Sequence, residues 1–450
     1  MIQSISTCLL CFIVIFSTGF TSTAYAQNLL EVYELALQND PVLKQVHASQ
    51  LAIGESKNQS VAKFLPNISA TGVSNLNRLT NNRATYQGSG VQDYSDNNFT
   101  VNLIQPLFHW EHWIQLSQSD NQIAQAEADY QTELQKMMVK ITEAYFNILS
   151  AQDNLDFTFS EKQAIARQLE QAKQRFAIGL IDITEVHQAQ AAFDRVIANE
   201  IEASNNVDNQ KEALTAIIGD QNLVLNNLGE SIPLARPVPD DISAWSDSAE
   251  LGNFSIISAF NQMEFSRKSI DLQRNGHLPQ LDLIASLGEY TTTSKFGLQG
   301  STEIVGVRLN LPLFEGGAVN SRTQQASYKF EQAKENLTAI KRAIKRQVKD
   351  AYRGITTSIS RVLALKTAVN SAEIALLATE AGFAIGVRTL VEVLDEQKNL
   401  YRDKRDYSRI RYDYLLNSIK LKQAASNLGP QDLEQINRLL VAKSVVIHEK

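Results

Sequence analysis

The sequence predicts an internally duplicated α+β fold in which pairs of β-strands alternate with very long coiled-coil helices. Two observations carry this prediction. A set of short motifs occurs twice, about 207 residues apart, and each copy contains both alternating strand-like segments and a helical pattern far longer than a globular helix. We therefore expect two related units packed about a common axis.

The duplication rests on four motifs, and its period is far larger than the 20–50 residues of solenoids and propellers. The offset is 383 − 176 = 207 for the first pair and 207, 206 and 213 for the others, so the drift is confined to loops. The pairs are Phe176-Ala-Ile-Gly179 with Phe383-Ala-Ile-Gly386, Ala144-Tyr145 with Ala351-Tyr352, Gln105-Pro-Leu-Phe108 with Leu311-Pro-Leu-Phe314, and Leu65-Pro-Asn67 with Leu278-Pro-Gln280.

These repeats set the expected domain boundaries. The expected segments are a signal peptide at 1–26, a first repeat at 27–219, an inter-repeat or equatorial linker at 220–247, a second repeat at 248–429 and a C-terminal tail at 430–450. The apolar run before Ala24-Tyr25-Ala26 is typical of a secretory signal, although the segment has no Lys or Arg. A lipoprotein attachment at Cys11 is the weaker alternative, because bulky Leu10 precedes it.

Composition excludes several classes of function. Both cysteines, Cys8 and Cys11, lie in the expected signal peptide, so the mature chain has no thiol for a disulfide or a thiolate metal site. A net charge of −7 and a pI near 5.6 argue against a nucleic-acid partner. We find no stretch of about 18 apolar residues after the signal, so we expect no transmembrane helix. A membrane crossing would then require a closed barrel.

Each repeat contains one very long helical run. Residues 109–178 include neither proline nor glycine, and a run of this length would be about 105 Å long at 1.5 Å per residue. Every seventh residue from Ile141 to Phe176, and each position 207 residues later, is apolar except Lys162. This strict period is typical of a coiled-coil seam.

Shorter helices are expected beside each long one. The repeated glycines Gly179 and Gly386 are natural left-handed helix ends, and helical pattern resumes at 182–219 and 389–428, so each pair forms an antiparallel hairpin. Further helical runs at 29–63 and 248–275 are half as long as the main ones. We expect them to stack end to end with the returning helices.

Two alternating segments precede each long helix. Val305, Val307 and Leu309 alternate with Gly306, Arg308 and Asn310, and similar alternation occurs at 281–288 and 99–103, with a less regular strand starting near Leu65. The polar face, with Asp282 and Arg308, suits a wet lumen, but an ordinary half-buried sheet shows the same alternation. Residues 78–95 and 290–302, rich in Asn, Gly, Ser and Thr, are expected to be exposed loops.

Four strands per chain cannot close a barrel, so several chains must combine. Two chains would give eight strands, whose side chains nearly fill the interior. Three chains would give twelve strands and leave a pore.

The hairpin motifs make the chain similar to a known family. Phe176-Ala-Ile-Gly-Leu-Ile-Asp-Ile-Thr-Glu-Val186, Phe383-Ala-Ile-Gly-Val-Arg-Thr-Leu-Val-Glu-Val-Leu-Asp395 and Pro312-Leu-Phe-Glu-Gly-Gly317 resemble those of TolC-type outer-membrane efflux proteins, and the resemblance covers residues 28–440. It implies a membrane α+β fold: a homotrimer with a twelve-stranded β-barrel in the outer-membrane lipid, continued into the periplasm by a long antiparallel coiled-coil α-helical barrel.

The resemblance also implies a function. The protein would be a passive exit duct for drugs or secreted proteins in a tripartite efflux or type I secretion system. A periplasmic adaptor (membrane fusion) protein and an inner-membrane ABC or RND transporter would open its periplasmic tip. A structural coiled-coil or surface-attachment protein of the cell envelope is the alternative, which would need no polar lumen. Which pump, adaptor and cargo are used stays open.

The resemblance places the periplasmic gate at Thr184, Glu185, Phe383 and Arg388, with Thr184 and Glu185 facing Arg388. Glu185 stands where the family usually has Asp, and Phe383 where Tyr is common. A second explanation is local: Asp182-x-x-Glu185 and Thr389-x-x-Glu392 have capping-box spacing, and Arg388 could answer the negative end of the long helix. The two roles can coexist.

Two further sets of residues follow from the resemblance and the expected threefold symmetry. Glu392 and Asp395 would form rings of carboxylates in the lumen, which select or bind cations. The exposed tips at Gly179, Leu180, Gly386 and Val387 would contact the adaptor.

No catalytic arrangement is found in the sequence, so we expect no enzyme and no cofactor. His109 and His112 have the i, i+3 spacing that two metal ligands can share, but they lie where strand gives way to helix. The neighbouring Trp110 and Trp113 are more typical of an interfacial aromatic belt, and we expect no metal.

Overall fold

A computed structural model describes residues 27–85, 88–220, 224–294, 297 and 299–441; the expected signal peptide lies outside the described residues. In chain order the elements are α1 (Leu29–Asn39), α2 (Pro41–Ala62), β1 (Asn67–Thr85), β2 (Gly88–Phe108), α3 (Trp110–Ala177), α4 (Ile183–Ile218), β3 (Asn227–Leu228), α5 (Ile242–Gly252), α6 (Phe254–Arg274), a 3₁₀ turn (Asn275–His277), β4 (Gln280–Thr292), β5 (Gly300–Asn310), α7 (Ala318–Ala384), α8 (Leu390–Ala424), α9 (Pro430–Asn437) and β6 (Leu440–Val441).

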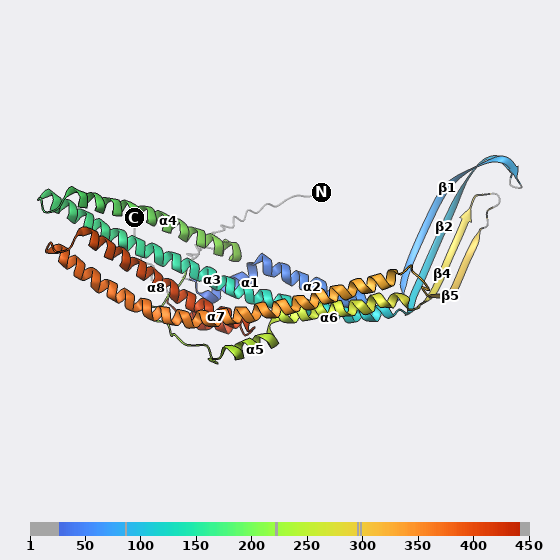
Figure 1. Cartoon of the computed structure of the whole chain (residues 1–450). Helices are drawn as coiled ribbons and strands as arrows, with labels where there is room; N and C mark the ends of the chain where they lie inside the picture. The colour runs from blue at the N-terminus through green and yellow to red at the C-terminus, as the bar shows by residue number, and fades with distance from the viewer. Residues whose placement is uncertain (1–26, 86–87, 221–223, 295–296, 298, 442–450) are drawn as a thin grey trace, which may run out of the picture.

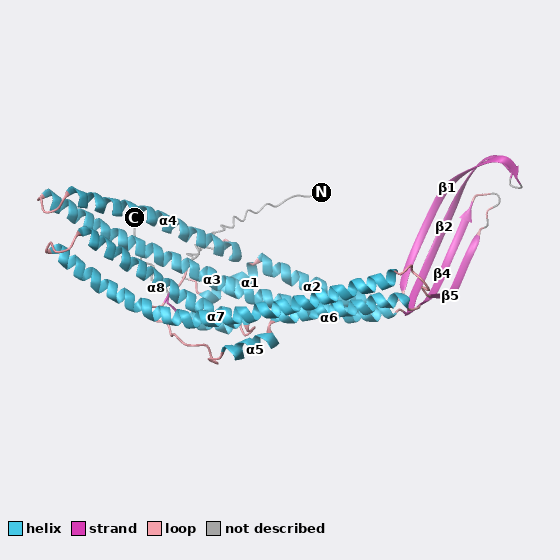
Figure 2. Ribbon diagram, in the orientation of Figure 1, coloured by secondary structure: helices cyan, strands magenta, loops and turns pink. Residues whose placement is uncertain are grey.

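The helices form a long bundle with the four-stranded sheet at one end and two helical hairpin tips at the other (Figures 1 and 2). Helices α3 and α7, with 68 and 67 residues, run the length of the bundle. Helices α4 and α8 pack on them toward the tips, and α2 and α6 pack on them toward the sheet. The predicted hairpins and the end-to-end stacking of the half-length helices are confirmed.

The helical runs predicted at 29–63 and 248–275 are each divided into two helices, whereas the sequence suggested one continuous helix in each. Asp40 ends α1 and caps α2, where its carboxylate accepts a hydrogen bond from the Val42 N–H (2.9 Å) and Pro41 occupies the first turn. Asn253 similarly caps α6 by accepting from the Ser255 N–H (3.0 Å). A capping side chain satisfies one of the free N–H groups of a new helix, and proline fits its first turn, so both breaks have a local cause.

The predicted coiled-coil seam is largely buried. Seven of the twelve seam positions are less than 9% exposed, which makes this face the inner surface of the bundle: Ile141, Ile148, Leu169, Val348, Ile355, Val362 and Phe383. The polar exception, Lys162, has a partner, because its ammonium lies 2.6 Å from the Glu200 carboxylate on α4. The seam therefore tolerates one charge by pairing it across the hairpin.

The sheet is antiparallel, with strand order β1-β2-β4-β5, so β2 and β4 join the two repeats at its centre. The edges of β1 and β5 have no partner strand in the described chain. The expected loop at 78–95 is wrong, since β1 and β2 continue through most of it. Polar cross-strand pairs extend the ladder there: the Asn77 amide donates to Asp96 (2.8 Å), and Arg78 pairs with Asp93 (2.7 Å). The second connector is shorter than expected, lying between Thr292 and Gly300.

The two faces of the sheet differ as the alternation predicted. Val305, Val307 and Leu309 are 80%, 61% and 64% exposed on one face. On the other face polar groups bond across strands: Ser286 donates to Asn102 (2.9 Å), and Arg308 pairs with Asp282 (3.0 Å). One apolar and one polar face suit a barrel wall between lipid and water.

The largest core lies midway along the bundle, where the linker and both ends of the described chain meet the long helices. Tyr145, 0% exposed, donates its hydroxyl hydrogen bonds to the carbonyls of Gln27 (3.2 Å) and Asn226 (2.9 Å), and burial raises its pKa. Its counterpart in the second repeat, Tyr352, donates to Asp240 of the linker. The region where the linker and both ends of the described chain meet the long helices is called the mid-bundle belt here. Tyr145 and Tyr352 hold it from the first and second repeats. The domain boundaries stay a prediction.

The C-terminal tail also enters the belt, in a way the sequence did not suggest. Helix α9 and strand β6 follow Gly429, and β6 pairs with β3 of the linker. A two-residue strand has no detectable alternation, so its partner could not be read from the pattern.

Helix α7 qualifies as a candidate membrane span by length and composition, contrary to the expectation that none would be found. Its most apolar window has a mean hydropathy of 1.3, and only 6% of that window is buried. A single helix of this kind is weak evidence for a span. The exposed apolar surface of α7 is equally well explained by a helix that packs against neighbouring chains.

Tyr145→Phe should lower the thermal stability of the assembled protein, because the half-buried Asn226 carbonyl loses its Tyr145 donor and the Gln27 carbonyl keeps only the Asn226 N–H (3.2 Å). The expected cost is about 1–3 kcal/mol per chain. It can be measured as the temperature at which detergent-purified oligomers dissociate. Tyr328→Phe is the matched control, since Tyr328 is 68% exposed. Equal effects of the two changes would contradict the anchoring role of Tyr145.

Candidate functional site

The hairpin tips expose apolar side chains around glycines that need a left-handed backbone. Gly179 and Gly386 have φ values of +77° and +80°. A Cβ added at either would meet no atom within 4 Å, so the strain of any substitution lies in the backbone alone. The flanking apolar residues are exposed to a similar degree, Ile178 71%, Leu180 68%, Ile385 77% and Val387 70%. Such a patch at the end of a rod is typical of a docking surface.

The start of α4 does not use the predicted capping box. Asp182 accepts hydrogen bonds from the N–H of Thr184 (2.7 Å) and from its hydroxyl (2.5 Å), and so caps the helix alone. These bonds hold the pKa of the Asp182 carboxyl below its ordinary value. Glu185 makes no capping bond, and its Oε2 is buried without a hydrogen-bond partner among the described residues. The capping explanation is therefore wrong for Glu185, and this carboxylate makes no hydrogen bond or ion pair with any residue that the structure describes.

The start of α8 does form the capping box. The Thr389 hydroxyl accepts from the Glu392 N–H (3.3 Å), and the Glu392 carboxylate accepts from the Thr389 N–H (2.8 Å). Glu392 also pairs with the Arg388 guanidinium at 3.0 Å. The Thr389 N–H and then Arg388 hold the pKa of the Glu392 carboxyl below its ordinary value. Glu392 thus combines a capping role with an ion pair.

Within one protomer the predicted gate residues are not brought together. Arg388 pairs with Glu392, on its own hairpin, rather than with Thr184 or Glu185. Asp395 is exposed one turn further along α8, with no hydrogen bond or ion pair to any described residue. A gate contact from Arg388 to Thr184 and Glu185 stays a prediction.

Phe383 is buried at the junction of the two hairpins. It is 5% exposed and belongs to a small apolar cluster with Leu169, Ala172, Ala189, Leu390 and Val393. Sequence reasoning missed the residue that covers it: the Arg175 guanidinium lies 4.3 Å from the Phe383 ring centroid. Arg175 and Phe383 come from different hairpins, so this contact ties the two tips of one chain together.

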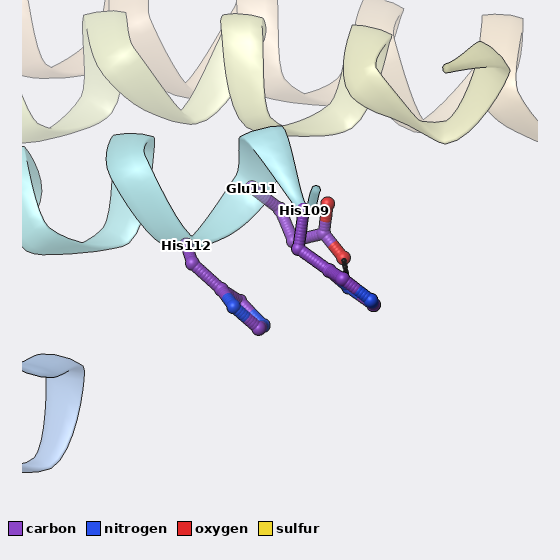
Figure 3. Close-up of side chains that lie close together, drawn as sticks. All are labelled: His109, Glu111 and His112. Carbon is purple, nitrogen blue, oxygen red and sulfur yellow. Dashed lines mark hydrogen bonds and ion pairs between the residues drawn. The ribbon is translucent and has the colours of Figure 1, made fainter. Parts of the chain in front are cut away.

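A second polar cluster lies at the opposite end of the helices, where strand β2 becomes α3 (Figure 3). His109 is hydrogen-bonded through both ring nitrogens, Nδ1 to Glu111 (3.0 Å) and Nε2 to Asp282 (2.8 Å). The amides of Asn275 (3.1 Å) and Gln280 (2.7 Å) donate to the same Glu111 carboxylate. The network connects the first repeat to the start of β4 in the second.

The ring geometry at this cluster does not suit a shared metal ion. His109, Glu111 and His112 could each offer a ligand atom within 4.8 Å of the others. The two rings, however, are stacked with an angle of 13° between their planes, so an ion in the plane of one ring lies outside the plane of the other. Burial and the adjacent His109 lower the pKa of His112. The arrangement is better described as a hydrogen-bonded clamp between repeats.

The tryptophans beside this clamp lie at the surface. Trp110 and Trp113 are 48% and 57% exposed, and the Trp113 ring packs edge-on against Phe64 at 4.8 Å. Their position at the helix end of the sheet is where an interfacial aromatic belt is expected; contact with lipid stays a prediction.

Comparison with known proteins gives consistent similarities in sequence and fold. The family model described as "Outer membrane efflux protein" matches residues 32–220 and 245–427. The outer membrane protein TolC of Vibrio cholerae is 36% identical over 429 residues, covering 94% of this chain and 96% of the relative. The alkaline protease secretion protein AprF of Pseudomonas aeruginosa is 28% identical, covering 92% and 87%. The crystal structure of the Campylobacter jejuni CmeC outer membrane channel superposes with a TM-score of 0.76 at 18% identity, covering 92% and 90%.

Thr389→Ala should loosen the start of α8, because the capping hydroxyl is lost. The amides of the first turn should exchange with solvent about five times faster, as expected for a cap worth about 1 kcal/mol. Hydrogen exchange measured by mass spectrometry on peptides covering 389–394 can detect this. Thr184→Ala is the control, since Asp182 continues to cap α4 through the backbone N–H. Similar acceleration at both hairpins would contradict this assignment of the caps.

Proposed function

The chain belongs to the outer membrane efflux protein family, and from this premise we propose how its residues close, open and connect the channel. It is an outer-membrane channel for efflux and type I secretion that extends into the periplasm. The observation that carries this conclusion is the family match over both repeats of a chain whose sheet and helical tunnel have the fold of solved channels. The fold is the trimeric barrel and helical tunnel of these channels.

Three protomers meet through the free edges of β1 and β5, giving twelve strands. Backbone groups at an open edge cannot be satisfied in hydrocarbon, so closure is required before the sheet can sit in the outer membrane. The polar pairs Ser286–Asn102 and Arg308–Asp282 then line a wet lumen, and Val305 and Val307 face lipid. The open edges favour this duct over a coiled-coil scaffold or surface-attachment protein.

The gate lies at the hairpin tips, where Arg388 has two candidate carboxylates. In the protomer it pairs with Glu392. The unpartnered Glu185 Oε2 supports a second contact, from Arg388 of an adjacent chain to Glu185 and Thr184, which closes the tip. Phe383 is buried under Arg175 and contributes packing. A tyrosine, which is common at this position in the family, would add a hydroxyl hydrogen bond.

Asp395 supplies a ring of carboxylates at the constriction. Glu392 lies one helical turn nearer the hairpin tip. Asp395 is exposed and has no described partner, as expected of a side chain that projects into a lumen. Three such carboxylates bind or select cations.

A periplasmic adaptor docks on the tips formed by Gly179, Leu180, Gly386 and Val387. Leu180 and Val387 are largely exposed in the protomer, so an apolar helical hairpin from the adaptor can cover them. The chain has no phosphate-binding motif of the Walker A type, so energy is supplied by an inner-membrane transporter of the ABC or RND class.

Replacing Gly179 and Gly386 with valine should abolish export while trimers persist. A β-branched residue is strained at positive φ and fills the docking surface. Export of a fluorescent pump substrate, measured in cells that depend on this channel, should fall to the level without channel. Gly252→Val is the control, since its added Cβ meets no atom and it lies in the α5 region away from the tips. Unchanged export in the tip variant would place the docking surface elsewhere.

Arg388→Ser should open the gate. A surface ion pair shifts the equilibrium between the closed and open gate by up to about fivefold. Three copies in a trimer therefore shift it by about a hundredfold if their free energies add. Trimers in planar bilayers should show higher single-channel conductance and admit larger solutes, with unchanged trimer stability. The same experiment tests the function itself, because wild-type trimers must conduct. If the variant conducts like wild type, Arg388 has no role in the gate and serves only the end of its helix.

Asp395→Ala should weaken block of the current by divalent or trivalent cations added on the periplasmic side. The Asp395 carboxylates are lost while Glu392 and the Arg388 contacts remain. The half-blocking concentration should rise about tenfold or more, as for the loss of a charge-assisted contact. Asp403→Ala is the control, since Asp403 lies two turns further along α8 beside Arg402. Equal block of both variants would contradict a lumenal Asp395.

A further inference from the structure

Arg175, in the last turn of α3, makes three contacts with the other hairpin. Its Nη1 donates to the Phe383 carbonyl (3.0 Å), and its Nη2 donates to the Ala384 carbonyl (3.3 Å). Its guanidinium also covers the Phe383 ring. The two carbonyls belong to the last turn of α7, where the helix dipole is negative. The Phe383 carbonyl also accepts from the Gly386 N–H (3.2 Å), so a cation from the first hairpin adds to the backbone cap at the end of a helix in the second.

The corresponding position in the second repeat is glycine, 207 residues later. An added Cβ at Gly382 would approach the Arg388 Cγ to 2.7 Å, so the stem of Arg388 occupies the space that a side chain there would need. The two tips are consequently not equivalent. At the described tips, Arg175 reaches from the first hairpin to the second, and the glycine at the corresponding position of the second repeat has no side chain to reach back.

Beside the apolar cluster around Phe383, which includes Leu169 and Ala172 of α3, the seam between the two hairpins contains individual polar bonds. Arg405 pairs with Glu161 (2.9 Å), and the Gln168 amide donates to Glu380 (3.3 Å); Glu161, Gln168 and Arg175 follow one another at about two helical turns. The Oε1 atoms of Gln168 and Gln397 are buried there without a partner in the described chain. Water can replace such bonds when the hairpins part, and the unpartnered oxygens gain hydrogen bonds in the process. The seam is therefore suited to separation.

We propose that Arg175 is the positioning residue that holds the second hairpin tip against the first in the closed channel, and that opening requires this intrachain contact to break. The proposal rests on the proposed function. The Arg175 contact differs from the proposed Arg388 contact because it lies within one chain and joins α3 to the carbonyl end of α7. Phe383 keeps the ring face that a guanidinium binds, although it lacks the tyrosine hydroxyl.

The test compares Arg175→Ala, Arg175→Lys and Gln174→Ala in full-length trimers reconstituted in planar bilayers. Loss of charged hydrogen bonds should raise the open fraction of Arg175→Ala about tenfold. Arg175→Lys should be intermediate, since an ammonium can donate to one carbonyl but cannot stack flat on the ring. Gln174→Ala should match wild type, because Gln174 is exposed and bonds only to Glu170 of its own helix among the described residues.

Thermal dissociation of the same trimers separates positioning from a merely structural role. A structural role would lower the dissociation temperature of Arg175→Ala and leave its open fraction at the wild-type level, which would overturn the proposal. Phe383→Leu, which keeps the residue apolar but removes the ring, should raise the open fraction by a smaller factor even if Arg175→Ala assembles poorly; no change in either would also overturn it. Failure of wild-type trimers to conduct at all would instead refute the proposed function.

Discussion

The unpaired edges of β1 and β5 are the constraint on which the rest of the structure depends. A four-stranded sheet has two rows of free backbone groups, and neither row can remain open in hydrocarbon. Closure by three copies satisfies both rows at once. It also places three sets of long helices side by side, which explains why much of the apolar surface of α7 is left uncovered in the single chain. The helical tunnel is thus a consequence of the barrel, because the same symmetry axis must run through both.

The bundle combines two kinds of seam with different mechanical properties. Within each hairpin the long and short helices pack on each other, and at the tips an apolar cluster that includes Leu169 and Phe383 also joins the two hairpins. Between the hairpins, Glu161, Gln168 and Asp153 make separate polar contacts, with orphan amide oxygens among them. Water can replace these polar bonds when the hairpins part. Each hairpin can behave as a rigid lever whose far end is fixed in the mid-bundle core.

The large features of the fold could be predicted because they depend on long periodic patterns. Seventy residues without Pro or Gly, an apolar residue at every seventh position and two repeated glycines determine the hairpins almost completely. The strands at 78–95 were missed since polar side chains there pair across the ladder, as Asp93 does with Arg78, although Asn, Ser and Asp are also usual in loops. The helix breaks at Asp40 and Asn253 carried a local signal in Asp-Pro and in a capping Asn.

The candidate site was less accessible to such reasoning. The spacing of Asp182 and Glu185 matches a capping box, yet Asp182 alone caps the helix, because the turn brings the Thr184 N–H closer. Arg175 acts on main-chain carbonyls, which have no sequence signature.

The mid-bundle belt also determines where the two ends of the described chain lie. Gln27 bridges to Leu225, and β6 pairs with β3, so both ends emerge at the waist of the molecule rather than at either mouth. A bulky group attached at Gln27 or Val441 would therefore lie against the side of the duct and leave both mouths open.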